Sequence, residues 1–169
     1  MDIKISCLVL AAGLSSRMPI GNKLLLKVKS LTIIEKTIKN LYDSNIDSFF
    51  IILGHQSNLF SKVLKNFKIP LIINENYQEG ISSSIKKGIS FIDHKNNGVM
   101  ICLADMPKIT SKTYNILIDE FKKFYNSATP LIILPEYNGQ TGNPVILSKH
   151  FFSELKKISG DVGAKYLIK

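Results

Sequence analysis

The chain has 169 residues, of which 45% are hydrophobic and 21% charged, a composition that excludes an intrinsically disordered chain. No apolar run reaches the roughly 18–20 residues of a membrane-spanning helix, so we expect no membrane partner. The net charge of +9 attracts anions, but the lysines are scattered and no nucleic-acid motif is present. We therefore expect a solvated lysine surface and no nucleic-acid partner, with steering of an anionic substrate as the alternative.

The N-terminal segment and the two cysteines indicate where the protein resides. The N-terminal segment carries Asp2 and lacks a basic region followed by a cleavage site, so we predict a first strand and not a signal peptide. Cys7 and Cys102 lie singly in apolar runs, which predicts buried, reduced thiols in place of a zinc site or a disulfide. Both observations favour a cytoplasmic protein.

Apolar runs alternate along the chain with segments of helical periodicity. We predict strands at 4–10, 47–53, 69–73, 98–103 and 131–134, with a weaker one at 144–147. We predict helices at 31–44, 55–67, 80–92, 110–125, 149–156 and 161–168, with Thr110 as an N-cap. This alternation is typical of a parallel sheet covered on both faces. The sequence thus predicts a single α/β domain, three-layer α/β/α and Rossmann-like, with a mostly parallel sheet and ligands at the carboxyl ends of its strands.

The first loop at such an end runs from Leu10 to Lys23. Small residues directly after a strand allow a ligand to approach the backbone closely. Arg17 and Lys23 add two cations suited to phosphate oxygens. The segment is neither a P-loop nor a dinucleotide-binding turn, and the residues alone leave open an ordinary loop with solvated charges.

Two further loops carry polar residues at predicted strand ends. Gly80–Ile85 opens a helix with three serines, which suits an anion or a sugar hydroxyl, although simple N-capping is the alternative. Asp105, in Leu103–Pro107, is a natural Mg²⁺ ligand if a triphosphate lies opposite, although an Asp that starts a turn before Thr110 is a common alternative.

The remaining candidates are weaker when taken alone. Residues 139–144 form a polar turn typical of a hairpin or loop. Residues 160–164 predict a helix start with Asp161 as its cap. His55 follows a strand end and could contact a ligand, whereas His94 and His150 are expected on the surface.

Taken in order, these segments resemble the motifs of the MobA-like nucleotidyltransferase family, most closely its molybdenum cofactor cytidylyltransferase branch. The matching segments are LAAGLSSRM with the following Lys23, then EGISSSIKKGI, LADMP, TGNPV and GDVGAK. They span nearly the whole chain. Ala12 and the GISSSI segment favour the cytidylyl branch, and hence CTP, over the guanylyl branch.

The resemblance implies transfer of CMP from CTP to molybdenum cofactor (molybdopterin) with release of pyrophosphate and with Mg²⁺ as cofactor. It implies that Arg17, Lys23 and Asp105 are catalytic and that Asp105 holds the metal. The implied nucleotide-binding residues are Leu10, Ala11, Ala12, Gly13, Arg17, Lys23, Gly80 and Ser84, and the implied acceptor-binding residues are Gly142, Asn143 and Pro144. A molybdoenzyme or its chaperone is the implied downstream partner.

Four departures from the family pattern keep alternatives open. Pro19 stands where a Gly is usual, Asn143 where many members have His, and Lys165 where Arg is usual. A further C-terminal segment, which in the family can supply a second carboxylate to the metal, is not found before Lys169. The alternatives are a guanylyl- or sugar-phosphate nucleotidyltransferase on the same fold, and a nucleotide- or cofactor-binding protein without catalysis.

Overall fold

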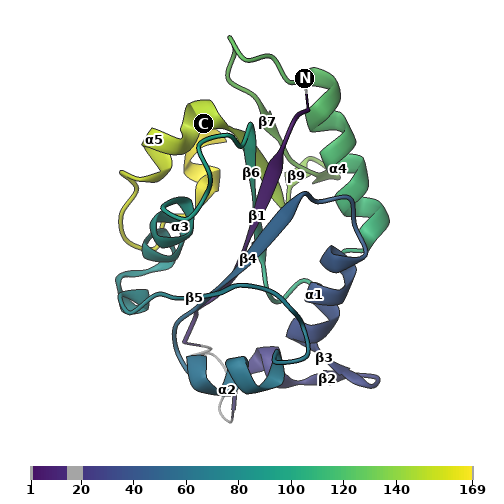
Figure 1. Ribbon diagram of the computed structural model, residues 1–169, viewed down its shortest axis with the longest axis vertical. Helices are drawn as coiled ribbons and strands as arrows, with labels where there is room; N and C mark the ends of the chain where they lie inside the picture. The colour runs from purple at the N-terminus through teal and green to yellow at the C-terminus, as the bar shows by residue number, and fades with distance from the viewer. Residues whose placement is uncertain (1, 15–20, 169) are drawn as a thin grey trace.

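A six-stranded sheet forms the centre of the computed structural model, which describes residues 2–14 and 21–168 (Figure 1). Its strand order is β5-β4-β1-β6-β10-β7, and β10 runs antiparallel to both of its neighbours while β5, β4, β1 and β6 are parallel. The strands are β1 (Ile5–Ala11), β4 (Ser48–Leu53), β5 (Leu71–Ile73), β6 (Gly98–Leu103), β7 (Ile132–Ile133) and β10 (Val145–Ser148). The predicted, mostly parallel α/β sheet is confirmed.

Helices cover both faces of this sheet (Figure 1). One face is covered by α1 (Ile33–Tyr42), α2 (Ser57–Val63) and α4 (Ser111–Phe124), and the other by α3 (Ile81–Ile89) and α5 (Phe152–Leu155). Along β1, Cys7 and Val9 enter the first core, whereas Leu8 and Leu10 enter the second. Because β1 is buried on both faces, it is apolar apart from Ser6 and does not alternate. The three-layer α/β/α prediction is confirmed.

Side-chain caps fix where two of the predicted helices begin. Thr32 and Glu35 form a capping box at α1, since each side chain bonds the backbone N–H of the other. The helix therefore begins at Ile33, and the predicted start at residue 31 is wrong. Thr110 accepts from the backbone N–H of Thr113 at α4, which confirms it as the N-cap.

Two small hairpins were not predicted as strands. The first pairs β2 (Lys27–Val28) with β3 (Leu31–Thr32), and the second pairs β8 (Glu136–Tyr137) with β9 (Gln140–Thr141). Asn138 and Gly139 turn the second hairpin with φ angles of 49° and 73°, as a tight two-residue turn requires. The remaining elements are short 3-10 helices: η1 (Lys23–Leu25), η2 (Tyr77–Glu79), η3 (Lys149–Phe151) and η4 (Ala164–Ile168).

The two cysteine thiols lie in the core below α4. Cys7 and Cys102 are both fully buried, as predicted. Burial raises the pKa of the Cys7 thiol well above its usual value. It also raises the pKa of the Tyr114 hydroxyl, which lies 3.2 Å from the Cys102 sulfur. The Cys7 thiol and the Tyr114 hydroxyl are therefore neutral parts of the packing.

The four parallel strands β1, β4, β5 and β6 end at Ala11, Leu53, Ile73 and Leu103. Their carboxyl ends meet at one edge of the sheet, which brings the loops after them together. Within residues 2–14 and 21–168, no helix is both long enough and apolar enough to span a membrane.

Candidate active site

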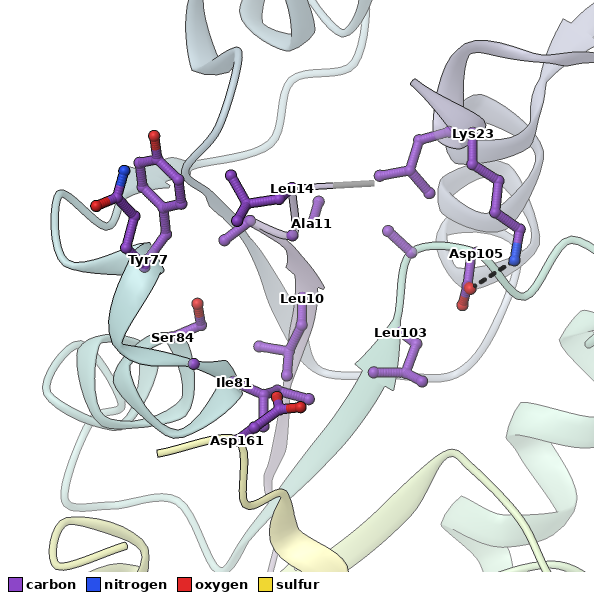
Figure 2. Close-up of a pocket in the computed structure, with 16 residues that line it drawn as sticks. Leu10, Ala11, Leu14, Lys23, Tyr77, Ile81, Ser84, Leu103, Asp105 and Asp161 are labelled. Carbon is purple, nitrogen blue, oxygen red and sulfur yellow. Dashed lines mark hydrogen bonds and ion pairs between the residues drawn. The ribbon is translucent and has the colours of Figure 1, made fainter. Parts of the chain in front are cut away.

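A cavity of about 570 Å³ opens at this edge, between the end of β1, the end of β6 and the start of α3 (Figure 2). The predicted site residues that line it are Leu10, Ala11, Ala12, Gly13, Lys23, Gly80, Ser84 and Asp105. The other lining residues are Leu14, Leu24, Tyr77, Gln78, Ile81, Leu103, Ala104 and Asp161. Segments far apart in the sequence therefore meet around one space large enough for a nucleotide-sized ligand.

The backbone after β1 forms the floor of the cavity. The carbonyl of Leu10 accepts from the N–H of Ala104 at 3.0 Å, and the carbonyl of Ala12 accepts from the N–H of His55 at 3.3 Å. These bonds hold the loop between the neighbouring strand ends. A Cβ on Gly13 would have no described protein atom within 4 Å, so the space above this residue is open to a ligand. Arg17 and Pro19 lie in 15–20, outside the described residues.

One side of the cavity carries an ion pair, which we call the ion-pair side. The Nζ of Lys23 lies 3.0 Å from an Oδ of Asp105 (Figure 2). Lys23 starts η1, whose N-cap Asn22 accepts from Leu24 N–H and donates to the side chain of Gln56. The two charged side chains are 51% and 38% exposed, so their attraction contributes only about 0–1 kcal/mol. A ligand can therefore separate them at little cost.

The opposite side, which we call the α3 side, is built from buried hydrogen bonds. Gly80 is the N-cap of α3 and no side chain caps the helix, so the interpretation of the serines as simple caps is wrong. The Nδ2 of Asn74, after β5, donates to the Oγ atoms of Ser83 and Ser84 at 2.9 and 3.0 Å. Ser83 in turn donates to the carbonyl of Gly80 at 2.8 Å. This network fixes Ser84 at the cavity wall.

The α3 side also contains a segment from the end of the chain. A Cβ on Gly80 would lie 2.5 Å from the backbone C and O of Gly160, and the N–H of Ser82 donates to the Gly160 carbonyl at 3.3 Å. Asp161 thereby lines the cavity, whereas η4 begins only at Ala164. The prediction of Asp161 as a helix cap is wrong, and sequence reasoning missed it as a site residue.

An aromatic side chain closes the cavity beyond β4. Tyr77 packs so closely on Gly54 that a Cβ there would lie 2.6 Å from the Tyr77 Cβ and 2.9 Å from the Ala12 Cβ. The ring of His55 lies 6.0 Å from that of Tyr77 and is not among the lining groups. His94 is exposed, as predicted, but His150 is half-buried, with its Nδ1 at 3.2 Å from the Ser148 Oγ.

The predicted acceptor residues lie at the same edge but are not among those that line the cavity. Gly142, Asn143 and Pro144 connect β9 to β10, and the bond between the last two is cis. Since Val145 pairs with Ile101 in antiparallel register, the preceding residues run past the carboxyl end of β6. The segment is held in place by the Gly142 N–H, which donates to the Pro135 carbonyl at 2.8 Å.

A model of the MobA-like NTP transferase domain matches residues 7–169. The chain belongs to the MobA-like NTP transferase family. It is 31% identical, over 147 residues, to the molybdenum cofactor cytidylyltransferase of Escherichia coli, a match that covers 86% of this chain and 70% of that protein.

Solved structures share the fold over nearly the whole chain. Rv0371c from Mycobacterium tuberculosis superposes with a TM-score of 0.85 at 22% identity, over 99% of this chain and 83% of that one. A complex of Rv0371c with manganese superposes with a TM-score of 0.81 at 22% identity, over 98% of this chain and 82% of that one. These likenesses confirm the nucleotidyltransferase-type α/β fold.

Proposed function

We propose that this MobA-like protein transfers CMP from CTP to molybdenum cofactor with release of pyrophosphate. The observation that carries the proposal is the cavity in which Lys23 and Asp105 face the open backbone of Leu10–Gly13. The 31% identity to a molybdenum cofactor cytidylyltransferase supports this choice of nucleotide and acceptor. The buried thiols Cys7 and Cys102 support a cytoplasmic location.

In the proposed reaction a terminal phosphate oxygen of the acceptor attacks the α-phosphorus of CTP. The bond from that phosphorus to the bridging oxygen breaks, and the electron pair leaves with pyrophosphate. The protein's task is to align the reactants and offset charge on the leaving group. We assign that task to Lys23, whose ammonium leaves Asp105 for the phosphates, and to Arg17 of the same sequence motif. Leu10–Gly13, Gly80 and Ser84 hold the nucleoside.

Asp105 is suited to hold a Mg²⁺ ion. Its carboxylate is part-exposed in the cavity, and the Lys23 ammonium already lies against one of its oxygens at 3.0 Å, where a cation is stabilised. Mg²⁺ in nucleotide sites takes one or two carboxylates together with phosphate oxygens and water. The ion, when bound, would neutralise phosphate charge. The manganese complex of Rv0371c, with its similar fold, supports a divalent cation in this family.

The proposal places the acceptor across the edge of the sheet from the nucleotide. Gly142–Pro144 run past the end of β6, next to the strand that leads to Asp105. An acceptor larger than a nucleotide would extend from the cavity toward this segment. Because the residues are anchored by a backbone bond and by β10, they would offer a fixed surface for it.

Pyrophosphate release from CTP in the presence of molybdenum cofactor tests the proposal. We expect Lys23→Ala and Asp105→Ala each to lower kcat/KM by about 100-fold or more, as loss of one stabilising charge typically does. Lys39→Ala and Asp43→Ala are matched controls, because that pair is also exposed, with its atoms 3.1 Å apart, but lies at the end of α1, away from the cavity. Unchanged release in both site variants would contradict the proposal. Parallel assays with GTP and with sugar phosphates distinguish the other transferases of this fold.

A further inference from the structure

Asp161 is a carboxylate of the cavity that the proposed reaction does not use. The charged side chains among the described lining residues are Lys23, Asp105 and Asp161, and the first two pair with each other. Among the residues whose side chains the structure describes, none forms a hydrogen bond or ion pair with Asp161. Figure 2 shows it beside Ile81, across Leu10 and Leu103 from Asp105. An exposed acceptor therefore faces the ligand space next to the apolar side chain of Ile81.

The position of Asp161 is set by packing and not by chance. The preceding residue, Gly160, lies directly against Gly80, where no side chain fits, and its carbonyl accepts from the N–H of Ser82. The start of α3 is held in turn by Asn74 through the buried hydroxyls of Ser83 and Ser84. The backbone next to Asp161 is thus held against the hydrogen-bonded start of α3, which places the carboxylate at the cavity.

The chemistry of a carboxylate limits what it can recognise. An ionised carboxylate only accepts hydrogen bonds, and it repels phosphate. The triphosphate and its metal ion therefore belong on the ion-pair side, and an uncharged ligand group opposite Asp161 must offer N–H or O–H donors. The neighbouring Leu10, Ile81 and Leu103 favour a flat heteroaromatic ring over a sugar, because they provide apolar surface for its faces.

We infer that Asp161 is a specificity-determining residue, which accepts a hydrogen bond from the exocyclic amino group of an aminated heterocycle. The inference rests on the proposed function, which offers two ligands with this chemistry. Cytosine carries an exocyclic amino group, and a pterin carries an amino group beside a ring N–H. Both amino groups can donate to a carboxylate, whereas uracil has no amino group.

Equilibrium binding to the full chain tests the inference, with CTP, UTP and free 2-amino-4-oxopteridine as probes. In Asp161→Asn and Asp161→Ala we expect about 10- to 100-fold weaker binding of one aminated ligand, the usual effect of losing a charged hydrogen-bond partner, and unchanged binding of UTP. Asp119→Asn is the matched control, because it removes the same charge from an exposed position on α4. The thermal midpoint of each variant checks that it is folded.

Each outcome decides the question. A selective loss of CTP binding would show that Asp161 contacts the cytosine. A selective loss of pteridine binding would show that it contacts the pterin of the acceptor substrate. Equal losses for CTP and UTP would overturn the inference in favour of ribose hydroxyls, and no loss for any probe would overturn it outright. Lys23→Ala, which should weaken CTP and UTP alike, tests the proposed function separately. A wild-type chain that binds none of the probes would refute both.

Discussion

The two sides of the cavity are built in opposite ways. On the ion-pair side, Lys23 and Asp105 are part-exposed and bonded mainly to each other. On the α3 side, Ser83, Ser84 and Asn74 are buried and share a chain of hydrogen bonds with Gly80. An exposed pair exchanges partners cheaply, whereas a buried network keeps one geometry. The first arrangement suits charge that is transferred during a reaction, and the second suits recognition of a ligand's shape.

Among substitutions that test this difference between the two sides, Gly80→Ala should have the largest effect on the free energy of unfolding. The new Cβ would lie 2.5 Å from the Gly160 backbone, and φ at this position is 98°, so the α3 side must open. We expect a loss of about 3 kcal/mol in the free energy of unfolding, from strain plus the lost contact, measured by urea denaturation. Gly139→Ala is the control: φ is 73° there but the space is open, and it should cost only about 1 kcal/mol. Equal effects of the two substitutions would contradict the packing account.

Removal of Asn74 should have the next largest effect. Asn74→Ala deletes the donor to two buried hydroxyls and the acceptor for the backbone N–H of Asn76. We expect a loss of about 2 kcal/mol in the free energy of unfolding, because the buried partners lose their bonds. The exposed Asn126, which accepts from Ala128 N–H, gives the matched Asn126→Ala control, with a loss below about 1 kcal/mol. A larger loss in the free energy of unfolding for Asn126→Ala than for Asn74→Ala would contradict a rigid α3 side.

The smallest effect on stability is expected from the ion-pair side. Lys23→Met should change the free energy of unfolding by less than about 1 kcal/mol, because the pair with Asp105 is part-exposed. The same substitution should weaken nucleotide binding by about 10-fold, since a charge-assisted contact to phosphate is lost. Thermal unfolding and equilibrium binding measure the two quantities. A large loss of stability with unchanged binding would reverse the proposed division between the two sides.

Local signals in the sequence predicted much of the fold and half of the cavity. Apolar runs located the strands, and the small residues after β1 and the Asp after β6 indicated the site, because both features follow from short stretches of chain. The approach of Gly160 to Gly80 is a tertiary contact across 80 residues of sequence, which no local pattern encodes. The local pattern at Asp161 therefore predicts only a helix cap.

The missed hairpins have different causes. The Asn138–Gly139 pair is a strong turn signal for a hairpin. The two flanking strands, however, are too short and too exposed to show a periodic pattern. The hairpin before α1 turns at Lys29, whose φ of 61° is unusual for Lys and has no sequence signal. The predicted start of α1 is two residues too early because Leu31 and Thr32 form the second strand of this hairpin before the helix begins.

Thermal unfolding with CTP, UTP, GTP and ATP, each with and without Mg²⁺, tests the central claim that this cavity binds CTP with the metal at Asp105. At a hundred times its dissociation constant, a ligand stabilises by about 2.7 kcal/mol, which raises the midpoint of a chain of this size by about 5–10 °C. The account predicts the largest rise with CTP and Mg²⁺, and loss of its Mg²⁺-dependent part in Asp105→Asn. The absence of a rise with all four nucleotides would contradict it.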